Sequence, residues 1–378
     1  MDSQTELERK IISGIEREGP ITFCRFMRAA LYDEHLGYYN TECAKIGPEG
    51  DYYTSSNVHP AFGRSLARQI IDLWNEPRLT LVEMGAGTGR LAADILAAMR
   101  EDHPSAFEHL SYIIVETSPA MRRLQNERLE GFGEKVCWQS LEETEREPVA
   151  GIFFSNELVD AFPVHRARRV AGAVSLRGQS LEEQYVTIDR SGVEPRLALA
   201  WGEPSSEKLA QYIERCGATL REGWEMEINL DALDWLAQVS RAMERGYLIT
   251  IDYGDVATHL IGEDRCRGTI RSFHRHRLAD SPLERAGHQD ITSSVNFTAL
   301  MEYGRDCGFE TVSYERQSAF LLRNGLVEII ARMEAATGII DDVKDRLAIK
   351  NLFLPGGVSD NFRALIQRKS MLDMARER

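Results

Sequence analysis

Residues 79–89 read LTLVEMGAGTG, a short apolar run that leads directly into a glycine-rich turn. The run Leu79 to Met84 has the length of a buried strand. The helix expected after the turn has one apolar face, formed by Leu91, Ile95, Leu96 and Met99. Glycine lets the backbone turn tightly and lets a ligand approach closely, and the first turn of a helix offers unpaired N–H groups. The stretch therefore predicts a strand–turn–helix unit of an α/β fold, with a ligand at the turn.

The same alternation continues on both sides of this stretch. Further strands are expected at 112–116, 136–138, 151–154 and 247–252, with a closing strand at 362–366. Helices are expected at 3–35 with a break at Gly19-Pro20, and at 60–74, 119–130, 233–243, 297–307 and 326–333. Strands that alternate with helices predict parallel βαβ units and a Rossmann-like sheet.

The chain of 378 residues is long enough for a sheet domain with additions. About 90 residues separate the fourth and fifth expected strands, which is too many for one crossover connection. The predicted organisation is a helical N-terminal region at 1–75 that covers the ligand site, an α/β core at 76–163 and 231–378, and an inserted β-rich subdomain at 164–230. Residues 255–290 are expected to form a polar loop.

Composition and charge limit the classes of partner. A net charge of −14 repels phosphate backbones, so no nucleic-acid partner is expected. No run of about 18 apolar residues occurs, so no membrane span is expected. The first ten residues are polar and unlike a targeting signal, which predicts a cytoplasmic protein. The six cysteines form no CxxC pair, which argues against a metal site and a disulfide scaffold. The oligomeric state is left open, a homodimer included.

The glycines at the turn narrow the choice of ligand. A dinucleotide-binding turn has the spacing G-x-G-x-x-G, whereas Gly85, Gly87 and Gly89 give the closer spacing G-x-G-x-G. That spacing suits a ligand with an amino-acid end, and methyltransferases that use S-adenosylmethionine carry an acidic residue where this chain has Glu83. Glu116 ends the next strand, where a carboxylate can accept hydrogen bonds from both ribose hydroxyls. An NAD enzyme and a turn that binds no ligand are the alternatives.

A polar segment follows the fourth expected strand, at the edge where ligands bind in open α/β sheets. Asn156, Glu157 and Asp160 are predicted to face the group that accepts a methyl. Carboxylates suit a guanidinium or an amine, through charge-assisted hydrogen bonds. The alternative is that Asn156 and Asp160 only cap the following turn.

A second polar segment, residues 51–56, is rich in hydroxyls and aromatic rings. Tyr53, Thr54 and Ser55 are predicted to cover the cofactor or the substrate. The alternative is the start of a capped helix, with Ser56 or Asn57 as the N-cap.

Seven stretches spread over nearly the whole chain share one family's pattern. In chain order these are 21–39, 47–55, 83–89, 155–164, 251–254, 268–271 and 290–292. Together they resemble the MidA-like family of class I S-adenosylmethionine-dependent methyltransferases, which includes the mitochondrial arginine methyltransferase that assists respiratory complex I assembly. The chain departs from that family at Ser56, where the family has proline. It also departs at Ser294 and Asn296, where the family has histidine and aspartate.

The resemblance implies a seven-stranded class I methyltransferase sheet whose last strand is antiparallel. It also implies S-adenosylmethionine as the cofactor and an arginine side chain of a protein as the methyl acceptor. A small-molecule O- or N-methyltransferase with the same fold is one alternative. A non-catalytic assembly or interaction protein that retains the fold is the other.

Overall fold

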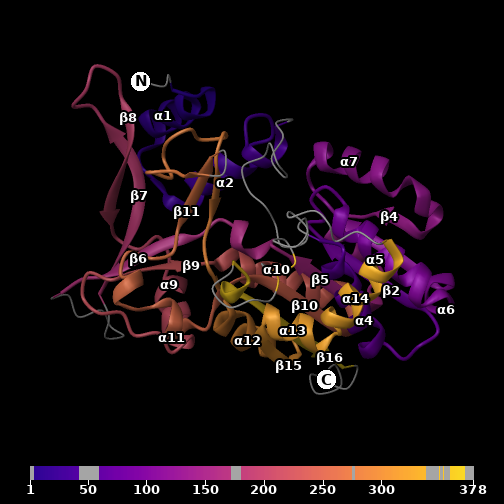
Figure 1. Cartoon of the computed structure of the whole chain (residues 1–378). Helices are drawn as coiled ribbons and strands as arrows, with labels where there is room; N and C mark the ends of the chain where they lie inside the picture. Colours follow the sequence, from indigo (N-terminus) through magenta and orange to yellow (C-terminus); the bar gives the residue numbers. More distant parts are fainter. Residues whose placement is uncertain are drawn as a thin grey trace.

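A mixed sheet forms the centre of the protein (Figure 1). The computed structural model describes residues 4–41, 59–171, 180–274, 277–337, 349, 352 and 358–370. The strand order is β15-β16-β10-β5-β2-β3-β4, and β14 pairs with β10. The strands are β2 (Leu79–Met84), β3 (Leu110–Val115), β4 (Val136–Trp138), β5 (Val149–Asn156), β10 (Met243–Asp255), β14 (Val295–Asn296), β15 (Phe309–Arg316) and β16 (Phe362–Lys369).

The direction of the strands matches the expected fold. Strands β4, β3, β2, β5 and β10 are parallel, and β16 runs antiparallel to both β10 and β15. The predicted seven-stranded sheet with an antiparallel last strand is therefore confirmed. Strand β15 is absent from the predicted strands because it lies at the sheet edge, where its mostly exposed or half-buried side chains leave no apolar run in the sequence.

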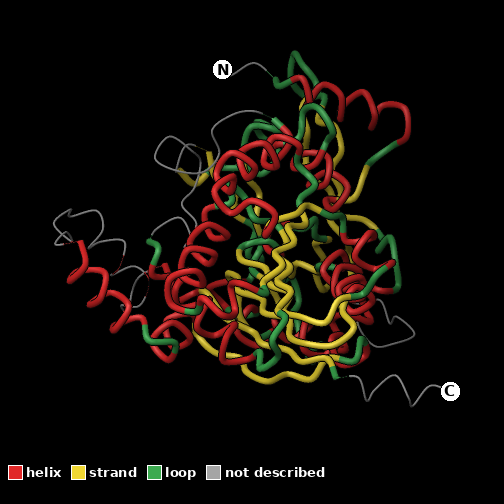
Figure 2. Tube along the Cα trace, turned by 90° about the vertical axis from the view of Figure 1, so that its right-hand side faces the viewer, coloured by secondary structure: helices red, strands yellow, loops and turns green. Residues whose placement is uncertain are grey.

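Helices lie on both sides of the central sheet (Figure 2). Alternate side chains of the strands contribute to the two apolar cores between the sheet and these helices. On β2, Leu79 and Leu81 join one apolar core, whereas Val82 and Met84 join the other. The first core is covered by α4 (Ala61–Leu73), α5 (Arg90–Asp102), α6 (Pro104–Glu108), α7 (Pro119–Leu129), α13 (Gln317–Arg323) and α14 (Leu326–Thr337). The second is covered by α8 (Leu141–Arg146), α10 (Leu230–Ala242) and α12 (Phe297–Asp306). None of the helices in the described ranges is long and apolar enough to cross a membrane.

A second, antiparallel sheet lies beside the first (Figure 1). Its strands are β1 (Ile21–Thr22), β6 (His165–Arg169), β7 (Leu181–Asp189), β8 (Arg196–Gly202) and β9 (Glu225–Ile228). The helices α1 (Glu6–Glu18) and α2 (Phe23–Tyr32) pack on this sheet, and α9 (Lys208–Arg215) packs near β9. The prediction treated 1–75 and 164–230 as separate parts. The structure instead joins them, because β1 pairs with β7 and Val164 and Val186 share a core with α1 and α2.

Local sequence signals explain where α1 begins and ends and where α2 begins. Thr5 and Glu8 form a capping box at the start of α1, and Gly19 ends that helix at a φ of 88°. The side chain of Thr22 then caps α2. The expected break at Gly19-Pro20 is therefore present.

The segment expected to be a polar loop at 255–290 is partly regular, so that prediction is wrong. It contains α11 (Ala257–Leu260), β11 (Arg271–His274) and β12 (Arg277–Leu278), and β13 (Asp290–Thr292) pairs with β11. These strands have two to four residues each, which is too short to leave a periodic pattern in the sequence.

Candidate active site

A pocket of about 720 Å³ opens at the carboxyl ends of the parallel strands. Its wall includes residues from 83–91 at the end of β2, 115–122 at the end of β3, 140–143 after β4 and 156–163 at the end of β5. The remaining lining residues come from α2, from Tyr39 in the turn that follows α2, and from α10: Arg28, Tyr32, Tyr39, Asp231, Asp234, Trp235 and Gln238. The volume lies in the range that encloses a ligand of nucleoside size. The pocket lies at the edge that the carboxyl-edge rule predicts, and its wall also includes 140–143, a segment that contains no predicted site residue.

The glycine turn after β2 adopts a backbone that other residues rarely adopt. Gly85, Gly87 and Gly89 have φ values of 72°, 51° and 75°. A Cβ at Gly85 would lie 2.8 Å from Cδ1 of Leu158, and a Cβ at Gly89 would lie 3.3 Å from Cα of Gln125. Gly85 and Gly87 line the pocket, whereas Gly89 stands behind it as the N-cap of α5. The turn therefore presents bare backbone to a ligand.

Glu116 lies on the pocket wall directly after β3 and is held on both of its oxygens. Its Oε1 accepts from the Ser118 N–H at 2.8 Å, and its Oε2 accepts from Nε2 of Gln125 at 3.0 Å. The buried Gln125 also donates to the Gly87 carbonyl at 2.8 Å and accepts from Nε1 of Trp138 at 2.8 Å. One amide thus ties the glycine turn to the carboxylate. Only one feature of the sequence could have drawn attention to Gln125. It is a polar residue within a helix that packs on the core.

Glu83 is the acidic residue at the end of β2, and it is 2% exposed. Its Oε2 accepts a hydrogen bond from the hydroxyl of Tyr112 at 2.7 Å. Burial raises the pKa of Glu83 to about 7, although the Tyr112 hydrogen bond acts in the opposite direction. Burial also raises the pKa of Glu116. Two carboxyl groups therefore border one end of the pocket, where they can accept hydrogen bonds from an amino group or from ribose hydroxyls.

The other end of the pocket is formed by Asn156 and Glu157, at the end of β5. Glu157 has a φ of 53°, in the left-handed region that non-glycine residues rarely adopt. Its N–H donates to the carbonyl of Ile251 at 3.0 Å, and Nδ2 of Asn156 donates to Oε1 of Glu157 at 3.2 Å. Such strain persists only where the surrounding structure enforces it, and it gathers at functional sites.

The buried carboxylate of Asp252 fixes the loop that carries Glu157. Its Oδ2 accepts from the N–H groups of Leu158, Val159 and Asp160 at 3.2, 2.9 and 3.4 Å, and its Oδ1 accepts from its neighbour Tyr253 at 2.7 Å. Burial raises the pKa of Asp252 to about 7, and the backbone donors oppose that rise. Asp252 is not among the site residues predicted from the sequence.

Asp160 is not among the lining residues of the pocket within the described chain. Burial and the charges of Asp252 and Glu157 raise its pKa well above the usual range of an aspartate, and its carbonyl accepts from the Ser293 N–H at 2.9 Å. Its contact with an acceptor stays a prediction. Tyr53, Thr54 and Ser55 lie outside the described residues.

The helix α10 adds side chains that the sequence did not single out. Asp231, Asp234 and Gln238 line the pocket at helical spacing. Nη2 of Arg28, from α2, donates to both carboxylate oxygens of Asp231, at 2.9 and 2.6 Å. The ring of Trp235 packs against Phe162 at 6.0 Å and 72°. The pocket therefore already holds one guanidinium against one of its own carboxylates.

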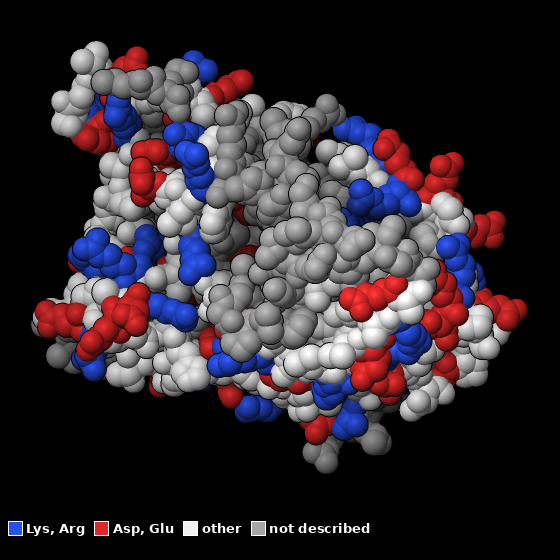
Figure 3. All heavy atoms as spheres, in the orientation of Figure 1, with Lys and Arg blue, Asp and Glu red and all other residues white. Residues whose placement is uncertain are grey.

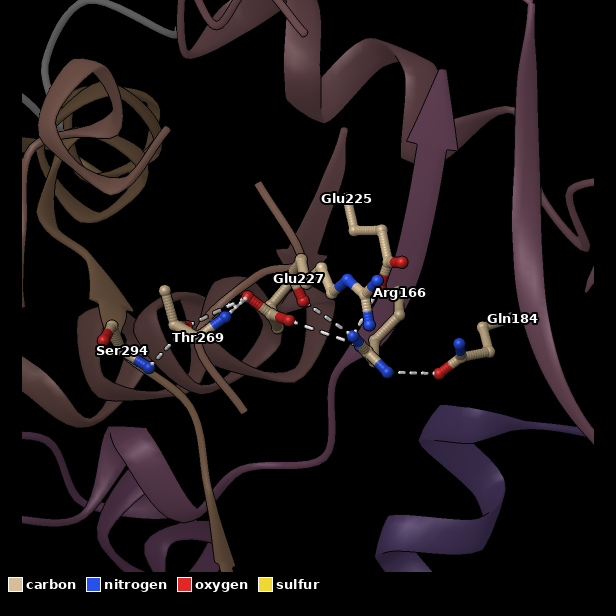
Figure 4. Close-up of polar contacts among 7 residues, drawn as sticks. Arg166, Gln184, Glu225, Glu227, Thr269 and Ser294 are labelled. Atoms are coloured by element: carbon tan, nitrogen blue, oxygen red, sulfur yellow. Dashed lines mark hydrogen bonds and ion pairs between the residues drawn. The ribbon is translucent and has the colours of Figure 1, made fainter. Parts of the chain in front are cut away.

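A buried ionic network braces the second sheet against the segment that follows β10 (Figure 4). Arg166 donates to Glu225 at 2.6 Å and to Glu227 at 3.3 Å, and it also donates to Gln184. Glu227 accepts from the N–H and the hydroxyl of Thr269, at 2.8 and 2.9 Å. The network gives a structural reason for residues 268–271 of the family pattern. Thr269 in that segment connects the chain after β10 to Glu227 of the second sheet.

This network also contacts Ser294, one of the positions at which the chain differs from the family pattern. The Ser294 N–H donates to the hydroxyl of Thr269 at 3.0 Å, so position 294 is held through its backbone (Figure 4). Asn296 caps α12 by accepting from Ala299 at 3.3 Å, a role that aspartate also fills. Neither Ser294 nor Asn296 lines the pocket in the described part of the chain. Among the described residues, no group of three His, Cys, Asp or Glu side chains is arranged to hold a metal ion.

Comparisons with known proteins agree on one family. A family model whose description is that of an S-adenosyl-L-methionine-dependent methyltransferase matches residues 65–315. The "Protein arginine methyltransferase NDUFAF7, mitochondrial" of Danio rerio is 28% identical over 332 residues, which cover 79% of this chain and 72% of that protein. Its Homo sapiens counterpart is 26% identical over 357 residues, which cover 85% and 74%.

A solved structure extends the likeness to the fold. The COG1565 superfamily member from Burkholderia thailandensis bound to S-adenosyl-homocysteine has a TM-score of 0.84 at 27% identity, covering 96% of this chain and 92% of that one. A second structure from the same organism has a TM-score of 0.81 at 26% identity. The sheet order, the pocket at the glycine turn and these matches lead to one conclusion. The chain belongs to the MidA-like family and is an S-adenosylmethionine-dependent methyltransferase.

Proposed function

We propose that this protein methylates a guanidinium nitrogen of arginine in a protein acceptor. The observation that carries the proposal is the carboxylate of Glu157 on the pocket wall, which a strained backbone and a hydrogen bond from Asn156 hold in place. Asp234 adds a further carboxylate to the wall, and Asp231 adds one that binds the guanidinium of Arg28. Relatives at 26% to 28% identity carry protein arginine methyltransferase in their names, which supports the same acceptor.

The residues proposed to hold the cofactor lie at the other end of the pocket. Gly85 and Gly87 would present backbone to its amino-acid part, with Glu83 nearby, and Glu116 would accept from the ribose hydroxyls. The segment 140–143 would border the base. The cofactor supplies a methyl group that its sulfonium already activates. The protein must therefore supply position, orientation and the exclusion of water.

At the acceptor end, Glu157 is proposed to orient the guanidinium and to take up its proton. A carboxylate beside a guanidinium forms short charge-assisted hydrogen bonds and fixes the plane of the group. The strained backbone of Glu157 and its contact with Asn156 hold that carboxylate in one place. The packed rings of Phe162 and Trp235 border the same end and limit access of water.

The test uses the purified protein, S-adenosylmethionine with a deuterated methyl group, and extracted cell proteins. Mass spectrometry is expected to find the label on arginine nitrogens. Glu157→Gln should lower turnover by roughly 100-fold, within the range of general acid–base effects, and leave cofactor affinity nearly unchanged. Glu147→Gln is the matched control, since Glu147 is exposed and outside the pocket. Label on lysine or on small molecules alone would reject arginine, and full activity of the Glu157 variant would remove it from this role.

The cellular location stays a prediction. The sequence predicts a cytoplasmic protein, whereas the relatives are named as mitochondrial. Cell fractionation with an antibody against the full chain would decide between the two.

A further inference from the structure

A second pocket, of about 520 Å³, adjoins the acceptor end of the first. The two pockets share three residues, Arg28, Asp231 and Asp234. The second pocket lies between the start of α2, the second sheet and the start of α10, where Cys24 and Tyr185 also border it. A chain segment whose side chain enters the first pocket would therefore pass over the second.

The charges of this second pocket differ from those of the protein as a whole. The full chain has 59 acidic and 45 basic residues. The second pocket, in contrast, is lined by four basic side chains, Arg25, Arg28, His165 and Lys208, and by two acidic ones, Asp231 and Asp234. Two of the basic side chains are paired, Arg28 with Asp231 and His165 with the buried Glu183. This leaves Arg25 and Lys208 against Asp234. The excess of positive charge predicts an anionic ligand.

His165 is built into this wall as a cation. Its Nδ1 lies 2.6 Å from Oε1 of Glu183, which is fully buried and also accepts from the Ser205 N–H at 2.6 Å. Burial acts to lower the pKa of His165, but contacts with Cys24 and Glu183 outweigh it and raise the pKa to about 9. The imidazolium is therefore present at neutral pH.

Arg25 and Lys208 complete the positive side. Both are exposed, and neither side chain has an ion-pair partner among the residues that the structure describes. Charges of both signs are interspersed over the face shown in Figure 3. The two side chains are positioned to bind an added carboxylate.

We propose that the second pocket binds an acidic side chain of the acceptor polypeptide, within a few residues of the arginine that is methylated. This inference rests on the proposed function, because the shared residues Arg28, Asp231 and Asp234 link the two pockets. The protein would thus select arginines that lie near a glutamate or aspartate. Arg28 stands between the two subsites, where it holds Asp231 until the acceptor guanidinium arrives.

The experiment uses short synthetic peptides with one central arginine and either glutamate or glutamine two residues away. Binding is measured by fluorescence anisotropy with S-adenosylhomocysteine present, so that no turnover occurs. The glutamate peptide should bind about fivefold more tightly, as expected for an exposed charge pair, and high salt should remove the difference. The double variant Arg25→Gln with Lys208→Gln should abolish this preference. Arg9→Gln, an exposed arginine on α1 outside both pockets, should preserve it.

Equal affinity of the wild-type protein for the two peptides would overturn the inference, and so would a preference that survives in the double variant. The acceptor is tested separately by mass spectrometry of the same peptides after reaction with S-adenosylmethionine. Arginine methylation without any glutamate preference would reject the second pocket alone. A glutamate preference that depends on Arg25 and Lys208, with the methyl group on another residue type, would reject the arginine acceptor alone.

Discussion

Asp252→Asn tests whether the loop that carries Glu157 is fixed from behind. In the wild-type protein, one oxygen of Asp252 accepts from three backbone N–H groups at 2.9 to 3.4 Å, and the other accepts from Tyr253 at 2.7 Å. An asparagine has only one carbonyl oxygen, so its NH₂ group must face at least one of these donors.

The expected magnitude follows from this mismatch. The best orientation keeps the oxygen on the three-donor side and leaves the Tyr253 N–H unpaired, which costs about 1–3 kcal/mol for a buried donor. Weaker hydrogen bonds to a neutral acceptor add to the loss, and removal of the repulsion between Asp252 and Asp160 offsets part of it. We expect a fall in the free energy of unfolding of about 1–3 kcal/mol. A displacement of Glu157 by about 1 Å would lower kcat by roughly 100-fold.

The assay combines urea unfolding with methyl-transfer kinetics, above about pH 8, where the carboxylate of Asp252 is ionised. Cofactor affinity, measured by calorimetric titration, should stay unchanged because Asp252 does not line the pocket. Asp264→Asn, at an exposed position, is the matched control. Wild-type kcat in a variant with lowered stability would refute the positioning role, since only the fold would then depend on Asp252.

Three further predictions concern the cofactor end and the second pocket. Glu116→Gln should weaken S-adenosylmethionine binding about tenfold, because one of its two acceptor oxygens becomes a donor, and calorimetric titration checks this. Gly87→Val should remove measurable cofactor binding while far-ultraviolet circular dichroism stays unchanged, because a β-branched residue is strained at a φ of 51° and adds bulk to the pocket wall. His165→Gln should destabilise the protein most at low pH. The pKa raised from 6.5 to about 9 gives the folded state about 3 kcal/mol that is fully present below about pH 6.5 and lost as pH rises through about 9. Thermal unfolding across that range should show the gap between wild type and variant closing above pH 9, and a constant gap would contradict the assignment.

Much of the cofactor end follows from local sequence. Residues 79–89 specify a strand, a tight turn and a helix through apolar periodicity and glycine, and the observed β2 has the predicted bounds. Glu116 and Glu157 follow from the rule that parallel strands end at one edge of a sheet, so their shared pocket was predictable. The antiparallel direction of the last strand was predicted from the family resemblance, because no hydrophobic periodicity in the sequence indicates strand direction.

The acceptor end was decided by contacts between segments far apart in the chain. Asp252 meets the loop after β5 across more than 90 residues, and Arg28 meets Asp231 across 203. The pairing of β1 with β7 likewise joins two parts that the sequence presents as separate. Periodicity reports which face of an element is buried, but it carries no information about which distant element covers that face. The fold class and the glycine turn therefore follow from the local sequence pattern, whereas tertiary contacts alone brought together the carboxylates and cations that we propose select the acceptor.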